Sequence, residues 1–127
     1  MFKKNILLLN IMPGEIYYFT KRTELRDLVK KSKAIIVDFT ATWCGPCKNA
    51  KPFLMEFFDN NKDRFDLVIV DVDKGSDICS AMKVKSYPTF LSFIHGELTS
   101  AQIGFDELQM QGFFNKTLYK LNNYGRF

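Results

Sequence analysis

The sequence has little of the residue types that build disulfide scaffolds, metal clusters and membrane spans. Its 127 residues include only three cysteines and one histidine. An odd count of three cysteines excludes a disulfide-stapled scaffold. Zinc needs four ligands. Beyond the pair Cys44 and Cys47 the candidates are Cys79 and His95, and these two do not make a second pair, so no metal site is expected. No apolar run approaches the roughly 20 residues of a membrane-spanning helix, so no membrane partner is expected either.

The chain also lacks a strong excess of one charge. Lysine and arginine number 18 against 14 acidic residues, a formal net charge of +4. The basic residues are scattered, which favours a solvated surface over a nucleic-acid site. Hydrophobic residues make up 46% of the chain and include 13 phenylalanines, a composition that excludes intrinsic disorder. The length suits one domain with a substantial core.

Hydrophobic periodicity predicts strands that alternate with helices. The expected strands are 16–19, 34–40, 65–72, 89–93 and 98–103, and the expected helices are 23–31, 44–60, 76–82 and 106–121. Pro52 should kink the second helix, and His95-Gly96 reads as a hairpin turn. Parallel strands need crossover helices, whereas a hairpin joins antiparallel strands. The order therefore predicts an α/β fold with one mixed sheet of about five strands and helices on both faces.

The two ends of the chain extend beyond this pattern. We expect a domain over 15–121, an N-terminal extension over 1–14 and a loose C-terminal tail over 122–127. The extension is interpreted as an extra strand or arm. A targeting segment is the alternative, because a basic start precedes the apolar run 6–12, but no small-x-small cleavage site follows.

The strongest chemical signal is Cys44-Gly45-Pro46-Cys47, placed where a buried strand meets a helix. The first helical amides lack intrahelical partners and the helix dipole is positive there, so a thiolate on Cys44 would be stabilised. Cys47 follows one turn later, within disulfide reach but further inside. Gly45 lets the backbone bend and Pro46 is tolerated in a first helical turn. The pattern predicts one exposed, reactive sulfur and one shielded sulfur that attacks second.

Two further features accompany the cysteine pair. Asp38 interrupts an apolar strand, where burial should raise its pKa and let it carry a proton during thiol exchange. The alternative is a carboxylate at a strand edge paired with lysine. Tyr87-Pro88 precedes another apolar strand, so a cis peptide bond is plausible beside the alternative of an ordinary trans turn. Cys79, on the short helix, reads as a small core residue.

These residues together resemble the thioredoxin family. The segment from Val37 to Lys48, with Trp43 before the cysteine pair, matches its signature, and Tyr87-Pro88-Thr89 and Gly104 follow in the family's order. The resemblance covers roughly 15–121 and implies the thioredoxin fold and dithiol–disulfide exchange. It implies that Cys44 is the nucleophile, that Cys47 is the resolving thiol and that Asp38 carries the proton. The residues implied to support the active site are Trp43, Gly45, Pro46 and Pro88. Those implied to bind substrate are Trp43, Tyr87, Pro88 and Gly104.

The resemblance also implies a setting for the chain. It predicts a cytoplasmic, monomeric protein disulfide reductase with no bound cofactor, reduced indirectly from NADPH by a thioredoxin reductase and acting on disulfide-containing proteins of the peroxiredoxin type. Alternatives are a secretory isomerase or oxidase, and a binding subunit or chaperone. Two departures from the family bear on this reading. Tyr87 is larger than the usual residue before the proline, and Ile69 replaces the buried lysine of many bacterial members.

Overall fold

The computed structural model describes residues 14–125, in which strands and helices alternate in the predicted order. The elements are β1 (Ile16–Tyr18), α2 (Arg22–Lys31), β2 (Ala34–Thr40), α3 (Gly45–Asn60), β3 (Asp66–Asp71), α4 (Ser76–Ala81), β4 (Thr89–Ile94), β5 (Glu97–Ile103) and α5 (Glu107–Asn122). Each bound lies within one residue of the prediction. The expected N-terminal extension falls outside the described residues except for Gly14.

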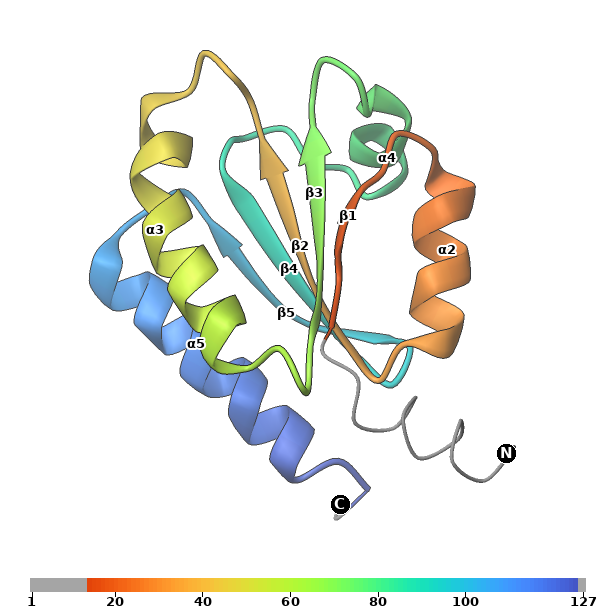
Figure 1. The fold of residues 1–127 in the computed structure, drawn as a ribbon. Coiled ribbons are helices and arrows are strands. Elements are labelled where there is room, and N and C mark those ends of the chain that lie inside the picture. Colours follow the sequence, from red (N-terminus) through yellow and green to blue (C-terminus); the bar gives the residue numbers. More distant parts are fainter. Residues whose placement is uncertain (1–13, 126–127) are drawn as a thin grey trace.

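The five strands form one mixed sheet in the order β1-β3-β2-β4-β5. Strands β1, β3 and β2 run parallel, while β4 lies antiparallel to both β2 and β5 (Figure 1). The hairpin between β4 and β5 turns at His95 and Gly96, which both have positive φ. The predicted mixed sheet is therefore confirmed, and β2 lies at its centre.

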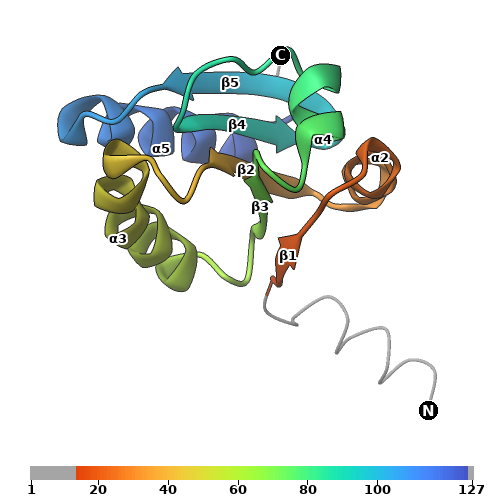
Figure 2. The ribbon, with the colours of Figure 1, turned by 90° about the horizontal axis from the view of Figure 1, so that it is seen from above.

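Two pairs of helices cover the two faces of the sheet. Figure 2 shows α3 and α5 on one side of the strands and α2 and α4 on the other. Side chains along β2 alternate between these layers: Ile36 packs with α3 and α5, whereas Val37 and Phe39 pack with α2 and α4. Asp38 shares the face of Ile36, so its carboxyl enters the α3 side of the core.

Two of the helix ends that differ from the prediction by one residue bear on the site and the tail. Helix α3 begins at Gly45, because Cys44 has extended backbone angles and caps the helix. The helix continues through Pro52 as one element. At the other end of the chain, α5 reaches Asn122, and Tyr124 stacks on His95 with ring centroids 3.8 Å apart. The described part of the tail therefore packs on the hairpin rather than hanging loose.

Candidate active site at the start of helix α3

A disulfide joins Cys44 and Cys47 at the N-terminus of α3, with their Cα atoms 5.3 Å apart. The backbone N–H of Cys47 donates to Cys44 Sγ at 3.2 Å, so the first sulfur occupies the capping position of the helix. The N–H of Cys44 in turn donates to the Ala41 carbonyl at 3.2 Å. The end of β2 and the start of α3 thus hold the first sulfur against the unpaired amides of the helix.

The predicted contrast between an exposed Cys44 and a shielded Cys47 is wrong for this oxidised form. Both residues are 6% exposed, and both pack in one cluster with Ala41. Tyr87 and Val72 pack against this cluster. The two sulfurs differ in surroundings instead. Cys44 Sγ lies 3.6 Å from the Tyr87 carbonyl oxygen, whereas Cys47 lines a pocket that includes neither Cys44 nor Tyr87.

The Tyr87–Pro88 loop faces the first sulfur. The peptide bond between these residues is cis, as the sequence suggested. The Gly104 N–H donates to the Pro88 carbonyl at 2.8 Å, and Gly104 has a φ of +79°, a conformation that glycine adopts without steric cost. The Thr89 hydroxyl donates to the Ser86 carbonyl at 2.7 Å, a hydrogen bond that joins the two ends of the loop. These contacts bring Gly104 and Pro88 together beside the disulfide.

Trp43 and Tyr87 form an aromatic margin around Cys44. Trp43 is 67% exposed and meets the Tyr87 ring edge to face, with centroids 6.1 Å apart. Tyr87 also packs against the buried cluster that contains Cys79, which ties this ring to α4. Gly45 and Pro46 are exposed directly after the first cysteine. The residues predicted to contact substrate are therefore joined to one another: Trp43 meets Tyr87, Gly104 donates to Pro88, and the Tyr87 carbonyl lies beside Cys44 Sγ.

Asp38 is a buried carboxyl without a hydrogen-bond partner for its Oδ1 atom. It is 6% exposed and lies between Ile69 of β3 and Phe90 of β4 in the sheet register. Burial raises the pKa of Asp38 to about 7, and the positive charge of Lys51 partly opposes this rise. The central position excludes a strand-edge carboxylate, because β2 has neighbours on both sides. A carboxyl with this pKa can accept and return a proton near neutral pH.

Lys51 is a site residue that the sequence analysis missed. It lies four residues after Cys47 on α3, so helical periodicity places both side chains on one face. That spacing was the available signal. Ile69, opposite Asp38, carries no charge, so Lys51 is the cation that acts on the carboxyl.

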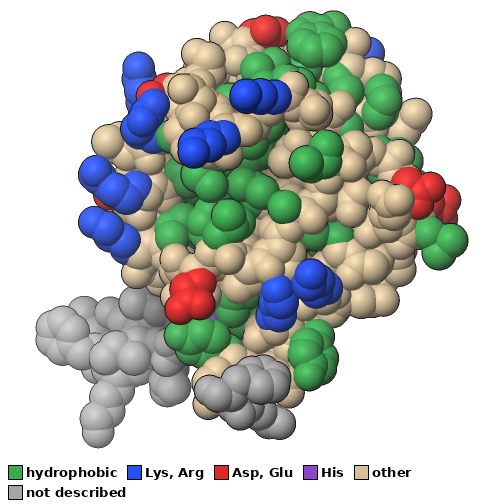
Figure 3. Space-filling view, turned by 180° about the vertical axis from the view of Figure 1, so that it is seen from behind, with side chains coloured by type: hydrophobic (Ala, Val, Ile, Leu, Met, Phe, Trp, Pro, Cys, Tyr) green, Lys and Arg blue, Asp and Glu red, His purple; other side chains and the backbone are tan. Residues whose placement is uncertain are grey.

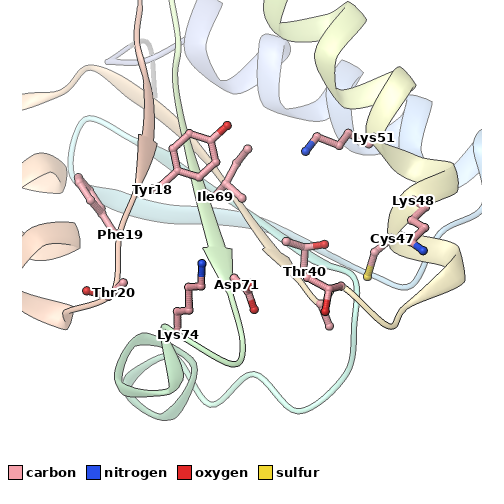
Figure 4. A pocket seen from close by; sticks show the side chains of 12 residues that line it. Tyr18, Phe19, Thr20, Thr40, Cys47, Lys48, Lys51, Ile69, Asp71 and Lys74 are labelled. Atoms are coloured by element: carbon pink, nitrogen blue, oxygen red, sulfur yellow. The ribbon is translucent and has the colours of Figure 1, made fainter.

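Of two pockets of similar volume on the surface of residues 14–125, one is lined by a cysteine of the disulfide. The first, of about 470 Å³, is lined by Cys47, Lys51 and Thr40 among others (Figure 4). The second, of about 430 Å³, lies between α2 and α4 and is lined mainly by apolar side chains. Figure 3 shows one face of the molecule on which hydrophobic side chains gather in the middle, with Lys and Arg side chains on several sides of them. The first pocket includes Cys47, whereas no cysteine lines the second.

Residues 14–125 contain no group of three histidine, cysteine, aspartate or glutamate side chains placed to hold a metal ion. Within the same range, no helix has the length and apolar character needed to cross a membrane.

Comparison with known proteins assigns the family. The family model described as Thioredoxin matches residues 17–116. A thioredoxin of Mycoplasmoides gallisepticum is 39% identical over 69% of this chain and 87% of its own length. The crystal structure of oxidised mitochondrial thioredoxin 3 from Saccharomyces cerevisiae superposes with a TM-score of 0.71 at 34% identity, over 79% of this chain and 94% of that one. A Plasmodium falciparum thioredoxin gives a TM-score of 0.72 at 28% identity, over 79% and 97%. The chain has the thioredoxin fold and belongs to the thioredoxin family of protein disulfide oxidoreductases.

Proposed function

We propose that this chain reduces disulfide bonds in other proteins by two successive exchanges at Cys44 and Cys47. One observation carries the proposal: the Cys44–Cys47 disulfide caps α3 with the Tyr87 carbonyl oxygen 3.6 Å from Cys44 Sγ, and β2, the strand that leads into the site, carries the buried carboxyl of Asp38. A binding subunit would need the exposed aromatic margin, but it would gain nothing from a buried, unpaired carboxyl that costs stability.

In the first exchange, the Cys44 thiolate attacks one sulfur of the substrate disulfide. A bond forms between Cys44 Sγ and that sulfur, and the other substrate sulfur leaves as a thiolate that takes up a proton. The capping position supports this role, because the Cys47 N–H points at the sulfur and the helix dipole favours negative charge there.

In the second exchange, Cys47 attacks Cys44 Sγ and displaces the substrate. The Cys44–Cys47 disulfide forms, and the substrate leaves with both of its cysteines reduced by two electrons from this chain. Cys47 must lose its proton first. Asp38 is the group proposed to accept it, directly or through one water, since its pKa of about 7 lets it be unprotonated at neutral pH and protonated afterwards.

The margin around Cys44 is proposed to bind the substrate chain. Trp43 and Tyr87 offer apolar contact, and the backbone on either side of Pro88 is expected to pair with an extended segment. Gly104 leaves open space where a side chain would stand, which lets the partner's backbone approach. Gly45 and Pro46 are proposed to complete this surface.

The reduced form must be regenerated by another protein, since no bound cofactor is proposed. We infer a thioredoxin reductase that passes electrons from NADPH, and a reducing compartment such as the cytoplasm. Substrates of the peroxiredoxin type are supported by a similar solved structure, 34% identical, which describes the thiol resolving mechanism in a yeast mitochondrial 1-Cys peroxiredoxin via glutathione/thioredoxin systems. The working unit is proposed to be a monomer with its domain over 15–121.

Trapping the mixed disulfide tests the order of the two exchanges. A Cys47→Ser variant should accumulate a covalent adduct with a disulfide substrate, because the first exchange proceeds and the second cannot. A Cys44→Ser variant is the matched control and should give none. Adducts are counted on non-reducing gels and located by mass spectrometry. Trapping through Cys47 alone would reverse the assigned roles.

The reduction potential separates a reductant from an isomerase or oxidase. Equilibration with dithiothreitol buffers should place the Cys44–Cys47 couple near about −270 mV, the value typical of thioredoxin. A potential near about −180 mV, typical of disulfide isomerases, would contradict the assignment as a reductant.

A further inference from the structure

The pocket beside Cys47 holds more positive charge than the exchange steps use. Lys48 and Lys51 line it from α3, and Lys74 lines it from the turn after β3. Asp71 is its only acidic lining residue, so three ammonium groups meet one carboxylate, a formal balance of +2. Lys51 also acts on Asp38, but Lys48 and Lys74 have no part in the proton transfer.

None of these lysines forms an ion pair within residues 14–125. The ion pairs of residues 14–125 join Arg22 to Asp77, Arg26 to Asp27 and Lys62 to Asp59. Asp71 Oδ1 instead accepts from the Asp73 N–H at 2.9 Å.

Figure 4 shows Lys51 and Lys74 extending into the same space from opposite sides. Like charges that converge on one pocket repel each other, and an anion placed between them relieves that repulsion.

The pocket also offers neutral donors and an apolar wall. Thr40 and Thr20 line it with Tyr18, whose side chain is 71% exposed. Its volume of about 470 Å³ exceeds the needs of a single ion. It borders Cys47, while the Tyr87–Pro88 loop borders Cys44. A protein held at Cys44 can therefore reach into the pocket with residues that flank its disulfide.

We propose that this lysine pocket binds an acidic segment of the protein whose disulfide is reduced. The inference rests on the proposed function and names one feature of its substrates: aspartate or glutamate beside the reactive cysteine. The interaction is non-covalent and leaves the exchange steps unchanged. Partners with basic flanks are disfavoured by the same charges.

Two disulfide peptides that differ only in the three residues beside one cysteine test the proposed preference for acidic segments. One carries three glutamates and the other three lysines. The ratio of their kcat/KM values should favour the acidic peptide for the wild type. Lys74→Gln should lower the ratio by about two- to fivefold, the range expected for one exposed ion pair. Lys74→Arg should restore it. Lys116→Gln on α5 removes the same charge away from the pocket and should leave the ratio as in the wild type.

The proposal is overturned if Lys74→Gln leaves the ratio unchanged, or if Lys116→Gln lowers it equally. A titration of the oxidised wild type with a disulfide-free acidic peptide decides the same question without exchange chemistry. At low salt, the peptide should shift the NMR signals of the Thr40 and Lys74 backbone amides. At 0.5 M salt this shift should disappear, because the Debye length is then about 4 Å and the charges are screened. A wild type that binds this peptide but reduces neither disulfide would refute the proposed function and leave the pocket confirmed. Absence of the shift would refute the pocket.

Discussion

Replacing Asp38 with asparagine should stabilise the oxidised protein, and more so at high pH. The side chain is 6% exposed and its Oδ1 atom has no partner, so ionisation in place is costly. Burial raises the pKa of Asp38 from 3.8 to about 7. An asparagine of nearly the same shape fills the same space and carries no charge at any pH.

The direction in which stability changes with pH follows from the number of protons bound in the folded and unfolded states. Between pH 3.8 and about 7 the folded protein holds the Asp38 proton and the unfolded chain has lost it. The folded state therefore binds more protons, and stability falls as pH rises through this window. The difference of about 3 pKa units corresponds to roughly 4 kcal/mol above pH 7, of which roughly 1.5 kcal/mol is already present at pH 5. The free energy of unfolding that Asp38→Asn adds relative to the wild type should thus grow by about 2–3 kcal/mol between pH 5 and pH 8.

Urea unfolding of both oxidised proteins at the two pH values measures this growth. In the oxidised form the bonded cysteines do not titrate. The contributions of all other titratable groups to the pH dependence of stability are shared by the two proteins and cancel in the comparison. Asp63→Asn, at an exposed position in the turn after α3, is the matched control for the loss of one carboxylate. An equal gain from Asp38→Asn at pH 5 and pH 8 would refute the assignment of a buried, raised-pKa carboxyl. The same variant should also slow substrate reduction, since asparagine accepts no proton from Cys47.

Three further predictions concern the surroundings of the site. Lys51→Met should raise the pKa of Asp38 further above 7, because burial then acts unopposed; carbon NMR of the carboxyl against pH measures it, and a fall would contradict the assigned interaction. Leu54→Ala should cost about 2–5 kcal/mol in urea unfolding, because Leu54 is fully buried in the core beneath α3; a loss below 1 kcal/mol would argue against that packing. In the reduced protein, iodoacetamide should modify Cys79 far more slowly than Cys44, since burial raises the pKa of the Cys79 thiol; equal rates by mass spectrometry would disprove its shielding.

The amino-acid sequence alone determined the order of elements and the chemistry of the pair. Continuous apolar runs identified β2 and β3 as strands buried on both faces, because no amphipathic alternative fits them. Asp106 predicted the start of α5, and its side chain accepts from the Gln109 N–H at 3.0 Å. Local signals of this kind survive because capping and periodicity depend on residues a few positions apart.

The tertiary structure alone decided which distant residues meet. Lys51 acts on Asp38 only because α3 packs over β2, and Lys74 joins the same pocket only because β3 lies beside β2. The equal burial of Cys44 and Cys47 likewise depends on Tyr87, which is 43 residues away from Cys44 in the chain. Burial, charge and pocket shape are set by neighbours in space, and a linear pattern holds no information on them until the sheet order is known.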